Sequence, residues 1–260
     1  MRKETSKRWS QVILFGLAIL SGLCSPLLAA NDSNSMELSV TADYFTKYIW
    51  RGQNINNGSV FQPSISIAKY GFTASVWGSL DLTTKNQHSG EFTEFDYSID
   101  YSASIPDFNI VGFSVGALYY DFPNTTYEPT TEVYGGLNFD LPLAPYIKWY
   151  HDVQAINGSY IQLGVGHSIG KIWEIPEKCY CDLQIASSIG YGTSRYNKGY
   201  FDTRGGKMND WTSSIALPFY IGAWSIKPSA NYSMMLSDAV RTVTEKSDNF
   251  WVGLTISTEF

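Results

Sequence analysis

Residues 94–105, with the sequence EFDYSIDYSASI, change character at every step along the chain. One set of alternate positions is apolar, and the other is acidic or carries hydroxyl groups. The apolar set is Phe95, Tyr97, Ile99, Tyr101, Ala103 and Ile105, and the polar set is Glu94, Asp96, Ser98, Asp100, Ser102 and Ser104. A period of two is the side-chain period of a β-strand, so the segment predicts a strand with one oily and one wet face.

The same alternation recurs along the chain, and no segment has a convincing helical period. We predict twelve strands, and each is close to the ~10 residues that a tilted strand needs to cross a bilayer. Their ranges are about 38–51, 60–69, 72–82, 92–105, 110–121, 131–141, 145–152, 159–169, 180–191, 210–219, 224–234 and 249–260. Ten or fourteen strands remain open because 145–152 is weak. Pro63 and Pro228 fall inside predicted strands, where they mark bulges or strand ends.

The connections alternate between tight turns and longer polar loops, with 83–90 and 193–210 among the loops. Short turns at one end and long loops at the other are typical of an outer-membrane barrel whose termini lie in the periplasm. We therefore predict an all-β, transmembrane antiparallel barrel with periplasmic termini. The link at 170–180 is longer than such a turn should be, and the pattern does not explain it.

Aromatic residues favour the barrel over the rival architecture, a secreted β-sandwich. In the predicted up-and-down order they gather near the strand ends, as the two aromatic girdles of a membrane barrel do. The first rim carries Tyr48, Trp50, Phe95, Tyr97, Tyr119, Tyr191, Trp211, Tyr232 and Phe250, and the second carries Phe219, Trp224 and Phe260.

The first thirty residues predict a secretory signal peptide. Residues 1–8 are basic, residues 11–30 are mostly apolar, and the small residues Ala29 and Ala30 come before a polar segment. An uncleaved anchor is the alternative, but the apolar run is short for a spanning helix. We take residues 31–260 as the exported barrel, destined for the bacterial outer membrane.

The charge balance bears on the partners of the exported part. Without the four basic residues and one acidic residue of the signal region, 14 basic and 23 acidic residues remain, a net charge of −9. This charge argues against nucleic acid as a partner. The spacing of His88, His151 and His167 does not suggest a zinc site, and we predict neither metal nor cofactor. Cys179 and Cys181 are too close together for a disulfide framework, and their role stays open.

The chain ends in FWVGLTISTEF, which alternates up to its last residue. We expect Phe260 to lie at the inner rim of the bilayer on the outward face of the closing strand. An alternating segment that ends on phenylalanine also resembles the C-terminal signal recognised by the barrel-assembly machinery. That resemblance implies that Phe260 is an assembly signal.

Three segments near the start of the exported part, TADYFTKYIWRGQN, GFTASVWGS and EFTEFDYSIDYS, carry a second resemblance. Together they resemble the TorF family of porins, whose members have an aromatic-Arg-Gly motif after the first strand. The resemblance covers about residues 38–102. Asp100 departs from it, because a glycine is expected there. It implies a small barrel that acts as a pore.

The predicted inner face points to a channel for passive diffusion of small hydrophilic solutes. Twelve strands leave a bore of ~12 Å if no plug intervenes. Acidic residues outnumber basic ones on this face, which predicts a mild preference for cations. The predicted channel-lining residues are Asp43, Lys47, Glu94, Asp96, Asp100, Glu132, Tyr134, Asp140, Lys148, Tyr150, Asp182 and Lys227. Lumen tyrosines either fill space or stack on sugar rings.

Two other functions stay open. One is a structural or adhesion barrel that acts through its extracellular loops. The other is an outer-membrane hydrolase, for which His151 and nearby Ser159 are the candidate base and nucleophile, although no nucleophile motif surrounds any serine. Arg195, Lys198, Arg204 and Lys207 make the loop 193–210 basic. We expect this loop to contact lipopolysaccharide phosphates or to fold inward towards the acidic lumen, with outer-membrane lipid around the barrel.

Overall fold

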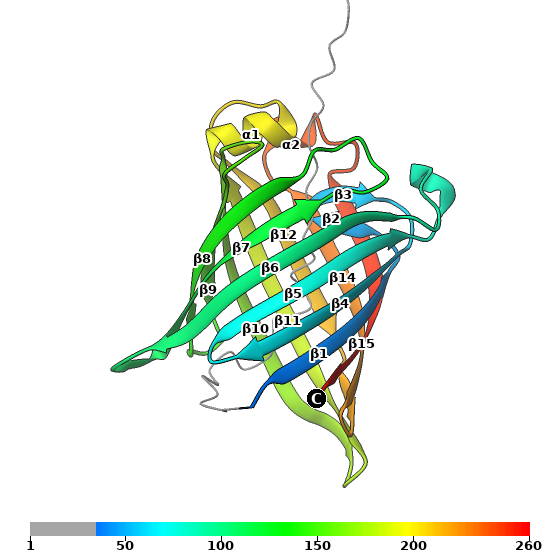
Figure 1. Cartoon of the computed structure of the whole chain (residues 1–260), viewed down its shortest axis with the longest axis vertical. Helices are drawn as coiled ribbons and strands as arrows, with labels where there is room; N and C mark the ends of the chain where they lie inside the picture. Colours follow the sequence, from blue (N-terminus) through cyan, green and yellow to red (C-terminus); the bar gives the residue numbers. More distant parts are fainter. Residues whose placement is uncertain (1–34) are drawn as a thin grey trace, which may run out of the picture.

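The computed structural model describes residues 35–260, so the predicted signal peptide at 1–30 lies outside the described residues. The described chain forms a closed antiparallel β-barrel (Figure 1). Its wall consists of β1 (Glu37–Phe45), β4 (Val60–Lys69), β5 (Phe72–Asp81), β6 (Phe92–Ile105), β7 (Phe108–Asp121), β8 (Thr130–Phe139), β9 (Tyr146–Asp152), β10 (Ser159–Ile175), β11 (Cys179–Gly192), β12 (Lys207–Ala216), β13 (Phe219–Ile221), β14 (Trp224–Met235) and β15 (Asp248–Glu259).

These thirteen segments make twelve strands, because β12 and β13 are successive parts of one strand that pairs with β11 on one side and β14 on the other. The prediction of twelve strands is confirmed. β1 closes the barrel on β15, from Ser39 opposite Glu259 to Phe45 opposite Gly253. Backbone hydrogen bonds between Leu38 and Phe260, at 3.1 and 2.9 Å, extend this closure to the last residue.

Both ends of the described chain lie at one end of the barrel, which we call the terminal end (Figure 1). The long connections lie at the opposite, loop end. They include the short helices α1 (Ser194–Phe201) and α2 (Asp238–Arg241) and a 3₁₀ turn at Thr84–Asn86. Within residues 35–260, neither helix has the length and apolar composition needed to cross a bilayer.

The two faces of the wall have opposite chemistry, as the alternation predicts. On β6, Tyr97 and Ile99 are exposed on the outside, whereas Glu94 and Asp96 are buried on the inside. Exposed apolar side chains surround the barrel in the same way on the other strands. Such a surface is suited to hydrocarbon rather than to water, and closing the sheet leaves no strand edge in the described wall.

The prediction of one strand over 38–51 is wrong at its end. β1 stops at Phe45, and the chain then forms a separate hairpin of β2 (Tyr48–Trp50) and β3 (Gln53–Asn56). This inner hairpin, residues 48–56, folds into the loop end of the barrel (Figure 1). Tyr48 and Trp50 were predicted at the rim, but their exposed fractions are 3% and 1%.

The unexplained link at 170–180 also has a structural account. β10 and β11 continue as a ribbon beyond the terminal end, with Ile175 opposite Cys179 at its tip, and β13 pairs with β11 there at Tyr180 and Cys181 (Figure 1). The register shifts between Ile169 and Trp173, so a bulge separates the ribbon from the barrel wall.

Each proline that falls inside a predicted strand lies at a gap in the pairing between strands. Pro63 stays in β4, but the described β4–β5 pairing skips from Phe61 to Ser64. Pro228 stays in β14 beside the interruption between β12 and β13. Because proline lacks a backbone N–H, interrupted pairing is expected at both positions.

Candidate functional site: an arginine-tipped hairpin inside the barrel

The inner hairpin places the Trp50-Arg51-Gly52 motif at its tip. Trp50 pairs with Gln53, which leaves Arg51 and Gly52 as the two turn residues, with φ of 44° and 79°. Two successive residues with positive φ form the tight turn that suits the twist of a hairpin. Gly52 also lacks room for a side chain, because an added Cβ would lie 2.5 Å from Cβ of Asp210. The aromatic-Arg-Gly motif is therefore the tip of a segment inside the lumen.

Arg51 forms a buried ion pair with the wall. Its Nη1 and Nη2 donate to Oε1 and Oε2 of Glu132, at 2.9 and 2.8 Å, and the exposed side-chain fractions are 7% and 2%. Tyr120 donates a further hydrogen bond to Glu132 at 2.8 Å. Parallel N–H···O bonds between a guanidinium and a carboxylate are both strong and geometrically specific.

Aromatic rings surround the same guanidinium. Its Cζ lies 4.5 Å from the ring centroids of Trp50, Tyr150 and Tyr160, and 5.9 Å from that of Tyr196. We call Trp50, Glu132, Tyr150, Tyr160 and Tyr196 the arginine cage. Ring faces attract a cation electrostatically, and the attraction is stronger where water is excluded.

The cage also keeps Arg51 charged. Burial by itself lowers the pKa of the guanidinium, but the nearby Glu132 and Tyr196 raise it by more. The pKa of Arg51 therefore lies well above its usual value, and the guanidinium stays charged.

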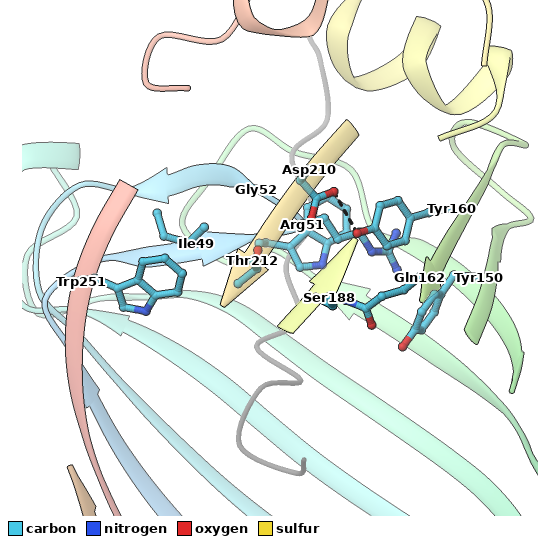
Figure 2. A pocket seen from close by; sticks show the side chains of 11 residues that line it. Ile49, Arg51, Gly52, Tyr150, Tyr160, Gln162, Ser188, Asp210, Thr212 and Trp251 are labelled. Carbon is cyan, nitrogen blue, oxygen red and sulfur yellow. Dashed lines mark hydrogen bonds between the residues drawn. The ribbon is translucent and has the colours of Figure 1, made fainter. Parts of the chain in front are cut away.

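A small cavity adjoins the cage (Figure 2). Its volume is about 40 Å³, which holds about three water molecules. Beyond the cage residues it is lined by Ile49, Gln162, Ser188, Asp210, Thr212 and Trp251. Figure 2 shows the hairpin tip lying between Trp251 of β15 and the opposite wall, where Tyr160 donates to Asp210 at 2.9 Å. The inner hairpin thus lies buried inside the loop end of the lumen, in the space that the bore of ~12 Å would need if no plug intervened.

Helix α1 covers the inner hairpin from above. Its Tyr196 and Tyr200 are buried, and the ring of Tyr200 lies 5.2 Å from that of Trp50. Arg195, Lys198 and Arg204 of the same loop remain exposed. The loop 193–210 therefore folds inward with its aromatic residues and presents its basic residues outward.

The predicted channel-lining residues separate by height in the barrel. Asp43, Glu94, Asp96, Glu132 and Tyr150 are buried in the loop-end half. The carboxyl groups of Glu94 and Asp96 lie side by side in this buried half.

The terminal-end half is more exposed to solvent. Asp100, Tyr134, Lys148, Asp182 and Lys227 are partly exposed on its inner face. Tyr134 donates to Asp100 at 2.5 Å, and Lys148 lies near the same carboxylate. This half therefore has a polar inner wall that water can reach.

Two predicted residues lie outside the barrel wall. Asp140 is exposed just beyond β8, at the terminal end. Lys47 lies between β1 and β2, near Lys246 and Lys85. Its pKa is lowered by burial and by the positive charges of those two lysines.

Sequence reasoning missed two parts of the arginine cage. Trp50 was assigned to a rim, and Tyr196 was not singled out. An available signal was the Arg-Gly pair between two short β-prone segments, since glycine in a two-residue link indicates a hairpin.

The candidate hydrolase residues do meet. Nδ1 of His151 lies 2.9 Å from Oγ of Ser159, and the His151 ring stacks on Trp149. Both residues alternate with the inward-facing Tyr150 and Tyr160, so they face outward near the loop end. No carboxylate within residues 35–260 hydrogen-bonds to His151, and no group of three or more His, Cys, Asp or Glu in that range is placed to hold a metal.

No family model and no curated protein matches the chain. Solved barrels do match. LpxR from Salmonella typhimurium has a TM-score of 0.50 at 8% identity, over 86% of this chain and 99% of that one. The NanC porin has a TM-score of 0.48 at 11% identity, over 85% of this chain and 98% of that one. The COG4313 outer membrane channel from Pseudomonas putida F1 has a TM-score of 0.46 at 7% identity, over 86% of this chain and 95% of that one. Identities this low concern the fold alone.

A closed antiparallel barrel with an apolar outer surface is the form in which β-strands cross a bilayer. The terminal end, where short turns join the strands, corresponds to the periplasmic side of such barrels. The protein is a β-barrel of the bacterial outer membrane.

Proposed function

We propose that the protein is an outer-membrane channel for small hydrophilic solutes, and that the inner hairpin holds it closed in the conformation described. The supporting observation is the contrast along the inner wall. Its terminal-end half is polar and partly exposed, whereas its loop-end half is filled by a segment that belongs to a connection and not to the wall. A hairpin attached only at its base can leave the lumen without breaking the barrel closure.

The proposed channel prefers cations. Glu94, Asp96 and Asp100 share the inner face of β6, and displacement of the inner hairpin would expose the buried Glu94 and Asp96 to water, which favours their charged forms. Arg51 is matched by Glu132 and contributes little free positive charge. Fixed charges in a narrow, low-dielectric bore act on a passing ion because the bore is comparable with the Debye length of ~8 Å.

Single-channel recording of the refolded protein tests both statements. We expect a mostly closed channel with brief openings, and a reversal potential across a potassium chloride gradient of the sign that indicates cation preference. A bilayer that stays silent at every voltage would reject the channel and favour the structural or adhesion role. A reversal potential of the opposite sign would reject the cation preference alone.

We also propose that the protein is related to the TorF family, because its aromatic-Arg-Gly motif follows the first strand and forms the tip of the inner hairpin. We also propose that Phe260, which is 72% exposed at the terminal rim, is recognised by the barrel-assembly machinery. Arg195 and Arg204 are exposed at the loop end, where lipopolysaccharide phosphates would lie. The signal peptide at 1–30 is proposed from the sequence.

A hydrolase is the second candidate, and the contact between His151 and Ser159 is the observation in its favour. A hydrolytic serine needs a base that is itself oriented and donors for the oxyanion. We propose instead that the contact joins β9 to β10 and has no catalytic role. Ester hydrolysis by the purified protein that disappears in both His151→Ala and Ser159→Ala would overturn this proposal.

A further inference from the structure

The arginine cage has the composition of a ligand site. It combines one buried carboxylate with several ring faces, the combination that proteins use to bind organic cations. Most of the cage does not belong to the inner hairpin. Glu132 and the rings of Tyr150 and Tyr160 are on wall strands β8, β9 and β10, and Tyr196 is on α1.

We propose that the cage is a binding site for solutes that carry a guanidinium group, and that Arg51 occupies it as an internal stand-in for such a solute. The inference rests on the proposed channel function and names its substrate class. A solute in the cage and Arg51 in the cage exclude each other, so binding of the solute favours the conformation in which the inner hairpin has left the lumen.

Chemistry favours guanidinium over simple ammonium ions. Glu132 offers both carboxylate oxygens to two parallel N–H donors, and the rings approach a flat group from several sides. A guanidinium matches both features, whereas an ammonium is a compact point charge with strong hydration. If Arg51 left and no cation replaced it, Glu132 would remain as a buried charge without a counter-ion, which is strongly unfavourable.

The contacts of the inner hairpin permit a solute to replace Arg51 in the cage. Nε2 of Gln53 is buried without an acceptor among the described residues, so insertion of the hairpin into the lumen leaves this donor unsatisfied. Polar contacts to a neighbouring loop lie at the base of the hairpin, where Nδ2 of Asn86 donates to the Ile55 carbonyl at 3.4 Å and Nζ of Lys85 donates to the Asn57 carbonyl at 2.9 Å. These contacts can persist while the tip moves.

Chemical rescue in detergent micelles tests the site without requiring conduction. We expect Arg51→Ala to lower the Tm, and millimolar methylguanidinium to restore part of the loss. Urea at the same concentration has a similar flat shape without the charge, so it should restore nothing. In Arg51→Ala/Glu132→Gln, the half-saturating concentration should rise about tenfold or more, because a hydrogen-bonded charge is lost.

The wild-type protein gives a second measurement that does not depend on any variant folding. Methylguanidinium should speed chymotryptic cleavage after Trp50, identified by a new N-terminus at Arg51, and urea should not. Lys178→Ala is the control, because Lys178 is exposed at the tip of the β10–β11 ribbon and its removal should leave both measurements unchanged.

The outcomes separate the two proposals. Rescue by urea, equal rescue of the double variant, or no change in cleavage after Trp50 would overturn the guanidinium site even if the protein conducts ions. Rescue by methylguanidinium together with a silent bilayer would keep the site and reject the channel. Channel openings that become more frequent with methylguanidinium, together with rescue, would support both.

Discussion

The loop-end and terminal-end halves of the lumen are built from the same strands but have different interiors. In the loop-end half, Arg51 and its cage are buried inside the lumen beside a cavity of about 40 Å³. In the terminal-end half, Asp100, Lys148 and Asp182 keep partial exposure on a polar wall. Alternation along a strand decides which side chains face inward. It does not decide whether the inside is open, because a connecting segment can fill a lumen that the wall leaves empty.

Removing the inner hairpin should have the largest effect. We expect replacement of residues 48–56 by a short Gly-Ser linker to make the loop-end half as open as the other, with a bore of ~12 Å. Single-channel conductance should then rise by roughly an order of magnitude, because a wide aqueous path replaces the buried hairpin. The same linker in place of residues 242–245 is the control. Equal conductance before and after replacement of 48–56 would show that the constriction lies elsewhere.

Breaking the ion pair should have the next largest effect. Glu132→Gln leaves the buried Arg51 without a counter-charge, so we expect a loss of about 3–5 kcal/mol in the free energy of unfolding. Urea unfolding in micelles measures the change, and Glu128→Gln, at an exposed position in the β7–β8 loop, is the control. A loss below about 1 kcal/mol for Glu132→Gln would mean that the cage is wet and weakly held.

Sequence alone predicted the wall of both halves. Each strand needs one apolar face for lipid and one polar face for the lumen, so the polarity of residues such as Ile99 and Asp96 indicates which way each side chain points. The strand range 92–105 was predicted with the bounds that β6 has. Closure followed from the even count and from the alternation that runs to the last residue.

The inner hairpin could not be predicted in the same way. Tyr48 and Trp50 are two residues apart and aromatic, so they fit the end of a membrane strand as well as they fit a buried hairpin. Their position depends on partners distant in sequence, since Trp50 lies near Tyr200 and Arg51 bonds to Glu132. Strand periodicity carries no information on such contacts, which is why 38–51 was predicted as one continuous strand.

Acidic residues in the two halves of the lumen should differ in their effect on ion selectivity. We expect Glu94→Gln with Asp96→Asn to reduce the cation preference of the hairpin-replaced barrel more than Asp140→Asn does. Glu94 and Asp96 are buried beside the passage, whereas Asp140 is exposed to water beyond the terminal end. Reversal potentials across a potassium chloride gradient measure both. A larger shift for Asp140→Asn would place the selective region at the terminal end.

The smallest effect is expected from breaking an exposed ion pair at the terminal end. Nζ of Lys171 lies 2.9 Å from Oε1 of Glu174 in the ribbon below the barrel, and the exposed side-chain fractions are 58% and 40%. The distance matches that of the pair between Arg51 and Glu132, but water surrounds these charges. We expect Lys171→Met to change the free energy of unfolding by less than about 1 kcal/mol and to leave conductance and reversal potential unchanged. Urea unfolding and single-channel recording measure these quantities. A clear change in conductance would make the ribbon part of the solute path, and control of passage would then no longer belong to the loop-end half alone.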